Sequence, residues 1–304
     1  MSVSEILKVL AFLFIGLQFA PTLIKNIKTQ FSNISEHKTK VGIVSLDGAI
    51  TDSEKTIKSL RKYFEDKDIK AIVFKIDSPG GASGSSQDIF QEILAMKKQN
   101  NKKIITFVQN VAASGGYYVA AATDHIIATP SAFIGSIGSY IAFPTIKNFI
   151  EQFKLKYEII KSGDYKTAAN PFTDLTEEQR QMFQELSNNV YYQFIRDMAA
   201  QRLALSKNYK QWADGKIFTG EQALKLGLID EIGSHSTVVK ALKEHAGIEG
   251  KIEWVKAKKT NNALYSLLSG EDDDKDSEFS TLFSRICSAV QRGYVEQQKT
   301  HATF

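Results

Sequence analysis

Two glycine-rich turns in this 304-residue chain carry residue types that can support nucleophilic chemistry. The first, DSPGG at residues 77–81, directly follows an apolar run and precedes a helical pattern. The second, AASGGYY at residues 112–118, follows another apolar run and places Ser114 immediately before two glycines. Glycine leaves backbone N–H groups free to face a ligand, and the start of a helix favours developing negative charge. The two turns together predict a serine nucleophile beside an anion-binding site.

The general base for such a serine is not expected to be a histidine. The histidines are scattered along the chain, at His37, His125, His235, His245 and His301, and none lies near either turn. A lysine can serve as the base when burial lowers its pKa from about 10.4 toward 7, a shift of roughly 3 units. The second turn also differs from the GxSxG elbow of α/β-hydrolases, because Ala112 occupies the first glycine position.

Composition excludes several classes of protein and site. Hydrophobic residues make up 43% and charged residues 24%, which is ordinary for a folded domain with a sizeable core. The 38 basic and 34 acidic side chains leave a net charge of +4, so nucleic acid is not an expected partner. The single cysteine, Cys287, and the absence of Cys/His ligand spacing predict no disulfide, no metal site and no cofactor.

Short β-type runs alternate with helical patterns over most of the chain. The predicted strands are Val41–Gly48, Lys70–Ser78, Lys102–Asn110, His125–Pro130 and Lys156–Gly163. The predicted helices cover about 53–66, 85–98 and 176–203, the last one opening on the capping-box sequence TEEQ. This alternation indicates an α/β fold with a mostly parallel sheet.

The N-terminal segment differs from the rest of the chain. Residues 6–24 are mostly apolar, with the cleanest run at 9–17, which suits the apolar region of a signal sequence. No small-x-small cleavage site follows, so residues 1–36 are expected to be an uncleaved signal anchor. The alternatives are a buried or amphipathic N-terminal helix and a cleaved signal. Lysines are more frequent after the segment than before it, which argues against export of the domain and leaves the orientation open.

The C-terminal residues 259–304 are expected to form a separate tail. An acidic linker at 271–276 precedes a helical pattern with one apolar face. This face comprises Phe279, Leu282, Phe283, Ile286 and Val290. Docking of this face on its own domain or on a neighbouring subunit is favoured over recruitment to a membrane or another partner. The catalytic domain is then expected to span residues 37–258.

Five ordered motifs give the chain a resemblance to a known family. They are DSPGG, AASGGYY, GSIG at 135–138, SGDYKT at 162–167 and IFTGEQALKLGLIDEIG at 217–233. In this order and spacing the chain resembles the signal peptide peptidase A family of serine peptidases. The resemblance implies a Clp-protease/crotonase-like fold with repeated β-β-α units, an N-terminal membrane-anchor helix and a Ser–Lys dyad. It also implies cleavage of apolar peptides such as signal-peptide remnants.

The resemblance assigns roles to individual residues. Ser114 would be the nucleophile, Lys166 the general base and Ser136 the hydrogen-bond partner that orients the lysine. The oxyanion hole would use the N–H groups of Gly115 and of Gly80 or Gly81, and the sequence does not decide between these last two.

Two rival assignments stay open, and two positions depart from the family pattern. Lys161 is the rival to Lys166, and Ser139 is the rival to Ser136. Asp77 stands where many relatives carry asparagine, which is expected to alter the hydrogen bonds of the turn. The segment 167–172 also differs from more polar relatives, so substrate contacts there do not transfer.

The expected protein is a single-pass membrane serine endopeptidase with its catalytic domain outside the cytoplasm. The alternatives are a crotonase-type acyl-CoA enzyme and a catalytically silent membrane scaffold. Small members of the resembling family form rings in which the lysine of one subunit approaches the serine of its neighbour. A homo-oligomer is therefore expected, with the helix Thr176–Leu203 and the apolar face of the tail at or near its contacts.

Overall fold

The computed structural model describes residues 21–22, 25 and 38–256. The predicted tail lies outside these residues, as does nearly all of the predicted anchor. No helix within the described part of the chain has the length and apolar character needed to cross a membrane.

A single sheet organises residues 38–256. Its strands are β1 (Lys38–Asp47), β2 (Ile69–Ser78), β3 (Lys103–Ala113), β4 (His125–Ala128), β5 (Phe133–Gly135), β6 (Ile217–Thr219), β7 (Glu231–Ile232) and β8 (Lys251–Lys256). The strand order is β6-β5-β3-β2-β1-β8, and β4 pairs with both β3 and β7. Every pairing is parallel except the one between β5 and β6. The α/β class with a mostly parallel sheet is confirmed.

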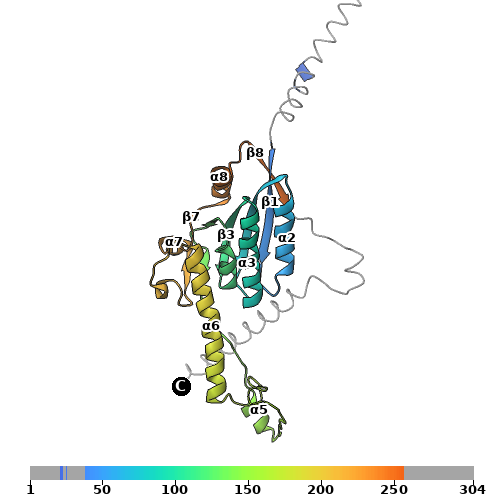
Figure 1. The fold of residues 1–304 in the computed structure, drawn as a ribbon, viewed down its shortest axis with the longest axis vertical. Coiled ribbons are helices and arrows are strands. Elements are labelled where there is room, and N and C mark those ends of the chain that lie inside the picture. The colour runs from blue at the N-terminus through green and yellow to red at the C-terminus, as the bar shows by residue number, and fades with distance from the viewer. Residues whose placement is uncertain (1–20, 23–24, 26–37, 257–304) are drawn as a thin grey trace, which may run out of the picture. The chain divides into compact units, whose positions relative to one another are not determined.

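Helices cover both faces of this sheet (Figure 1). They are α2 (Glu54–Glu65), α3 (Ser83–Gln99), α4 (Gly115–Ala120), α5 (Lys147–Gln152), α6 (Glu177–Gln201), α7 (Gly220–Lys225) and α8 (His235–Ala246), with a 3-10 turn at Tyr209–Gln211. Phe74 and Ile76 of β2 pack in the larger core with α2 and α3, while Ala71 and Val73 pack in the smaller core with α8. Burial on both faces explains the continuous apolar runs that identify β2 and β3 in the sequence.

One predicted strand, Lys156–Gly163, is wrong. These residues form no strand, and the side chain of Ile160 is 96% exposed. They belong to a segment, residues 139–176, that we call the arm. The arm follows β5, includes α5 and leads into α6, and α5 lies at the end of α6 that is farther from the sheet (Figure 1). A β-type run needs a partner strand, and the arm provides none for Lys156–Gly163.

The arm packs on itself and on the first half of α6. The rings of Phe143 and Phe183 lie 4.4 Å apart, and the Lys147 ammonium is 2.6 Å from the Asp174 carboxylate. The predicted capping box at the start of α6 is confirmed, because the Thr176 hydroxyl accepts from the Gln179 N–H while the Gln179 side chain accepts from the Thr176 N–H. Only the second half of α6 reaches the core of the sheet domain, through Phe194 and Met198.

Candidate active site

Ser114 occupies a sharp turn between β3 and α4. Its backbone has φ 49° and ψ −122°, a conformation that residues other than glycine seldom adopt. Its N–H donates to the Gly135 carbonyl at 2.8 Å, which holds the turn against β5. Strained residues of this kind concentrate at active sites because the surrounding structure must hold them in place. The predicted nucleophile therefore has a fixed backbone, and its side chain is half-buried.

The loop after β2 packs directly against this turn. Gly80 has φ 101°, and a Cβ there would lie 2.7 Å from the Gly115 nitrogen and 2.8 Å from the Ser114 Cβ. A Cβ on Gly81 would lie 2.2 Å from the Ile50 carbonyl oxygen. Only glycines allow the two loops to approach this closely. The two motifs that are separate in the sequence thus form one structure at the carboxyl ends of β2 and β3.

The hydrogen bonds of this loop separate the two glycines that the sequence could not separate. The Gly80 N–H donates to the Ser78 hydroxyl at 3.2 Å. Within the described residues, neither the Gly81 N–H nor the Gly115 N–H donates to any acceptor. The Gly81 nitrogen lies 3.3 Å from the position that a Cβ on Gly115 would take. Gly81 is therefore a close neighbour of Gly115, the residue after Ser114. Unpaired N–H groups at such positions can bind an oxyanion.

Ser136 directly follows β5, the strand that pairs with the end of β3. Ala113 pairs with Gly135 in the β3–β5 ladder, so Ser114 and Ser136 are the next residues of the two strands. Ser136 also has a positive φ, 51°, and its N–H donates to the Lys216 carbonyl at 2.7 Å. The structure thus brings together five of the predicted site residues: Ser114, Ser136, Gly80, Gly81 and Gly115.

Lys166 is not brought to Ser114 within this chain. It lies on the exposed surface of the arm, and no hydrogen bond joins its ammonium to the Ser114 hydroxyl. The side chain of Lys166 makes no hydrogen bond or ion pair with any residue that the structure describes. The rival Lys161 is engaged, because its ammonium donates to the Asp164 carbonyl at 2.6 Å. The rival Ser139 lies in the arm, where its carbonyl accepts from the Ser187 hydroxyl at 3.2 Å.

The sequence predicts no functional role for Ser78, although this residue stands in the DSPGG motif. Its buried hydroxyl donates to the Gly48 carbonyl at 2.6 Å and accepts the Gly80 N–H. It therefore fixes the loop that carries Gly81. The sequence signal for this role is a small hydroxyl residue at the end of an apolar run, and such residues are equally common in ordinary turns.

Two tyrosines of the AASGGYY motif hold α4 in place through hydrogen bonds of their hydroxyl groups. The Tyr117 hydroxyl donates to the Leu228 carbonyl at 2.7 Å, and the Tyr118 hydroxyl donates to the Asp197 carboxylate. Burial raises the pKa of both hydroxyls well above the usual tyrosine value, so both stay protonated and act as hydrogen-bond donors. Among the described residues, no group of three or more His, Cys, Asp or Glu side chains is arranged to hold a metal ion.

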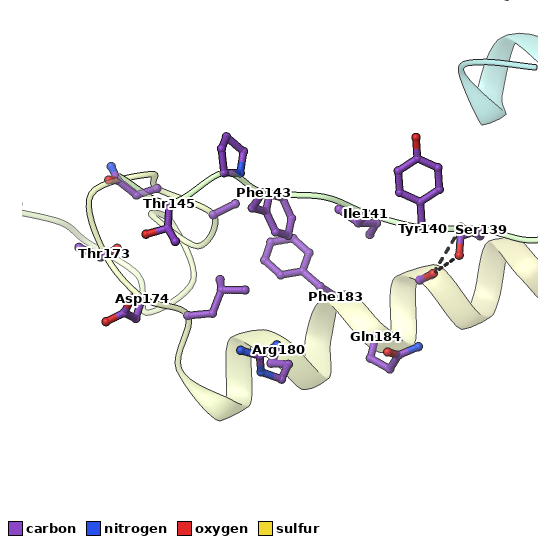
Figure 2. Close-up of a pocket in the computed structure, with 15 residues that line it drawn as sticks. Ser139, Tyr140, Ile141, Phe143, Thr145, Thr173, Asp174, Arg180, Phe183 and Gln184 are labelled. Atoms are coloured by element: carbon purple, nitrogen blue, oxygen red, sulfur yellow. Dashed lines mark hydrogen bonds between the residues drawn. The ribbon is translucent and has the colours of Figure 1, made fainter. Parts of the chain in front are cut away.

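A cavity of about 660 Å³ lies between the arm and the first half of α6. Figure 2 shows Phe143 of the arm and Phe183 of α6 facing each other in it, with Arg180 on α6 near Phe183 and Asp174 toward one end. Neither Ser114 nor Lys166 lines this cavity. It is therefore a feature of the arm and separate from the turns that carry the predicted nucleophile.

Comparison with known proteins identifies the family. The profile of peptidase family S49 matches residues 96–249. A candidate protease of Synechocystis sp. is 32% identical over 213 residues, which cover 70% of this chain and 76% of that protein. A candidate signal peptide peptidase SppA of Enterococcus faecium is 32% identical over 218 residues, 67% of this chain and 63% of that protein.

One solved structure, of a variant of the membrane-bound stomatin-specific protease 1510-N, has a TM-score of 0.49 and 18% identity. It covers 73% of this chain and all of that one. The family profile and the Synechocystis relative together show that this chain is a serine peptidase belonging to peptidase family S49.

Proposed function

We propose that this chain is a membrane-anchored serine endopeptidase whose Ser–Lys dyad consists of Ser114 and Lys166. Signal-peptide remnants or other apolar peptides are its proposed substrates, in line with the name of the Enterococcus faecium relative. One observation carries the proposal: Ser114 has a positive φ of 49° beside the unpaired N–H groups of Gly81 and Gly115. Free N–H donors near a serine hydroxyl support acyl transfer, because they can stabilise the oxyanion that forms when the serine attacks a carbonyl.

The proposed reaction begins when neutral Lys166 accepts the proton of the Ser114 hydroxyl. The Ser114 oxygen attacks the scissile carbonyl carbon, and the N–H groups of Gly81 and Gly115 stabilise the oxyanion. The lysine then gives its proton to the leaving amine, and water hydrolyses the acyl-enzyme. Ser136, which directly follows β5, is proposed to accept or donate a hydrogen bond that orients the lysine.

The dyad is proposed to form between two copies of the chain. Lys166 is exposed and without a partner among the described residues, while Ser114 has no base within hydrogen-bond distance there. The arm that carries Lys166 also exposes many large apolar side chains: Tyr140, Ile141, Ile146, Phe149, Phe153, Leu155, Tyr157, Ile160 and Tyr165. A surface of this kind is typical of a protein interface.

The crotonase-type enzyme and the silent scaffold are not favoured. Membership of a serine peptidase family argues against an acyl-CoA enzyme. A scaffold has no need for a strained Ser114 or for two unpaired N–H groups beside it.

The first test is the loss of the nucleophile. Ser114→Ala is expected to lower the rate of peptide cleavage by at least about a thousandfold and to abolish labelling by a fluorophosphonate probe. The matched control is Ser131→Ala, which changes an exposed serine ahead of β5 and should leave both readouts unchanged. Retention of more than about a hundredth of the wild-type rate in Ser114→Ala would overturn the assignment.

The membrane anchor has its own test. Deletion of residues 1–36 is expected to release an active catalytic domain from membranes, because β1 begins at Lys38. Sedimentation with vesicles should fall while peptide cleavage persists. Equal sedimentation of the truncated and full-length proteins would contradict an anchor in this segment. Protease protection of the full-length protein in sealed vesicles would also decide the orientation.

A further inference from the structure

We infer that the hydrogen bond between Asp77 and Asn110 positions the serine turn against the loop that carries Gly81. This inference rests on the proposed function, because it concerns the alignment of Ser114 with its oxyanion donors. Asp77 is the last but one residue of β2 and lies three positions before Gly80. Asn110 lies near the end of β3, four positions before Ser114. Neither residue has a role in the reaction proposed above.

The pairing of β2 and β3 changes register at this point. Ile76 pairs with Val108, but Ser78 pairs with Ala112. Between these two pairs β2 has one residue, Asp77, whereas β3 has three, residues 109–111. Strand β3 therefore holds two extra residues opposite Asp77. Such a bulge disrupts the backbone ladder locally and bends the strand that contains it. The ladder resumes at Ser78 and Ala112, so the bulge lies immediately before the pair that leads into Gly80 and Ser114.

A side-chain hydrogen bond spans this interruption. The Asn110 amide nitrogen donates to the Asp77 carboxylate at 2.7 Å. Asp77 is itself fixed on its other side, because its carbonyl accepts the Gly48 N–H at 2.9 Å. A hydrogen bond to a carboxylate is shorter and stronger than one between neutral groups. The bond therefore ties the bulge of β3 to the end of β2, directly upstream of both catalytic loops.

Alignment matters here more than stability does. A displacement of about 1 Å between a nucleophile and its stabilising groups can slow a reaction by about a hundredfold. The bond also has a fixed polarity, because an ionised aspartate only accepts and the Asn110 amide group must therefore donate.

Exchange of the two side chains tests the inference. Asn110→Asp places two carboxylates against each other and is expected to lower kcat by about tenfold or more, with little change in KM. The double variant Asp77→Asn/Asn110→Asp restores a hydrogen bond of reversed polarity, and its kcat should return to within about threefold of wild type. The control is Asn101→Asp, the same chemical change at an exposed position ahead of β3, with wild-type kcat expected.

Two results would overturn the inference. One is a kcat for Asn110→Asp within about twofold of wild type, and the other is a double variant as slow as Asn110→Asp. Circular dichroism checks that the single variant folds. If it does not, Asn110→Ala removes the donor without adding charge, and an unchanged rate of fluorophosphonate labelling in that variant overturns the inference. Failure of the proposed function is read separately, from activity that persists in Ser114→Ala.

Discussion

The serine turn and the arm differ in how completely one chain fixes their functional residues. At the serine turn, the backbone of Ser114 is tied to β5 and the Gly80 loop is tied to Ile50 by two hydrogen bonds, of 2.9 and 2.8 Å. In the arm, Lys166 is exposed, and the arm also exposes large apolar side chains such as Phe153 and Ile160. One half of the proposed dyad is therefore preorganised, and the other half is not.

The difference indicates which part of the proposed site one chain completes by itself and which part it does not. Fixed N–H donors stabilise charge without having to reorganise during the reaction, so they belong on a rigid sheet. A lysine that must be neutral needs burial, and an exposed arm does not provide it. A partner that covers the arm would supply that burial. The serine turn should therefore be sensitive to small steric changes, whereas the arm should respond to changes in assembly.

The largest effect is expected from a single methyl group at the serine turn. Gly80→Ala would place a Cβ 2.7 Å from the Gly115 nitrogen and would put alanine at φ 101°. Peptide cleavage is expected to fall by at least about a hundredfold, because the two loops must separate. Gly84→Ala is the matched control, since a Cβ there meets nothing within 4 Å, and it should cleave at the wild-type rate. Equal activity of the two variants would contradict the preorganised serine turn.

Substitution of Lys166 in the arm is expected to cause a large loss of peptide cleavage. Mixing two inactive variants is expected to restore part of it. Lys166→Arg should be nearly inactive, because a guanidinium cannot give up its proton, while Lys161→Arg should stay active. Inactive Ser114→Ala and Lys166→Ala subunits, mixed in equal amounts, should regain activity. About a quarter of the contacts would then join an intact serine to an intact lysine. The measurement is peptide cleavage before and after subunit exchange.

One outcome would remove the difference between the two regions, and a second would only change which lysine of the arm is the base. No recovery in oligomers shown to contain both variants would mean that each chain builds its own dyad. Loss of activity in Lys161→Arg but not in Lys166→Arg would move the base to Lys161.

The serine turn could be predicted from the sequence, and the arm could not. Strand β3 and the glycines after it leave a local signal, because burial on both faces of a sheet demands apolar residues and close loop packing demands glycine. The proposal of Gly81 over Gly80 as an oxyanion donor depends on the Ser78 hydroxyl, which accepts the Gly80 N–H. That contact depends on how the loop folds back, and residue types alone do not record it.

The sequence pattern in the arm predicts a strand that the structure does not contain, and the reason is physical. The run Lys156–Gly163 carries apolar residues that in a single chain usually mean burial in a sheet. Here Tyr157 and Ile160 are 50% and 96% exposed, so the same composition serves a surface. The bulge opposite Asp77 was also invisible in the sequence, because a register shift depends on the partner strand. The anchor, the tail and the domain boundaries stay predictions.

Substitution at the junction of α6 with the sheet domain is expected to have the smallest effect on peptide cleavage. It should nevertheless lower the free energy of unfolding. Arg202, only 8% exposed at the end of α6, makes two hydrogen bonds of 2.8 Å to the Asp230 carboxylate. Asp230→Asn would leave this arginine without its counter-charge and should lower the free energy of unfolding by about 3 kcal/mol. Asp68→Asn, in an exposed pair with Lys40, is the control and should change the free energy of unfolding far less, because solvent screens an exposed ion pair. Cleavage per folded molecule should stay near wild type in both, because neither residue touches the serine turn.

The pH dependence of that loss separates an ion pair from simple packing. Burial acts to raise the pKa of the Asp230 carboxyl, but the hydrogen bonds and the charge of Arg202 outweigh it and hold the pKa below its ordinary value. A carboxyl whose pKa is lowered by folding stabilises the protein above the unfolded-state pKa of about 3.9. This stabilisation is lost as the pH falls through the folded-state pKa. Denaturant unfolding of wild type and Asp230→Asn should therefore differ most at neutral pH, and the difference should shrink below about pH 4. A difference that stays constant from neutral pH to about pH 3 would show that Asp230 holds α6 by packing and not by its charge.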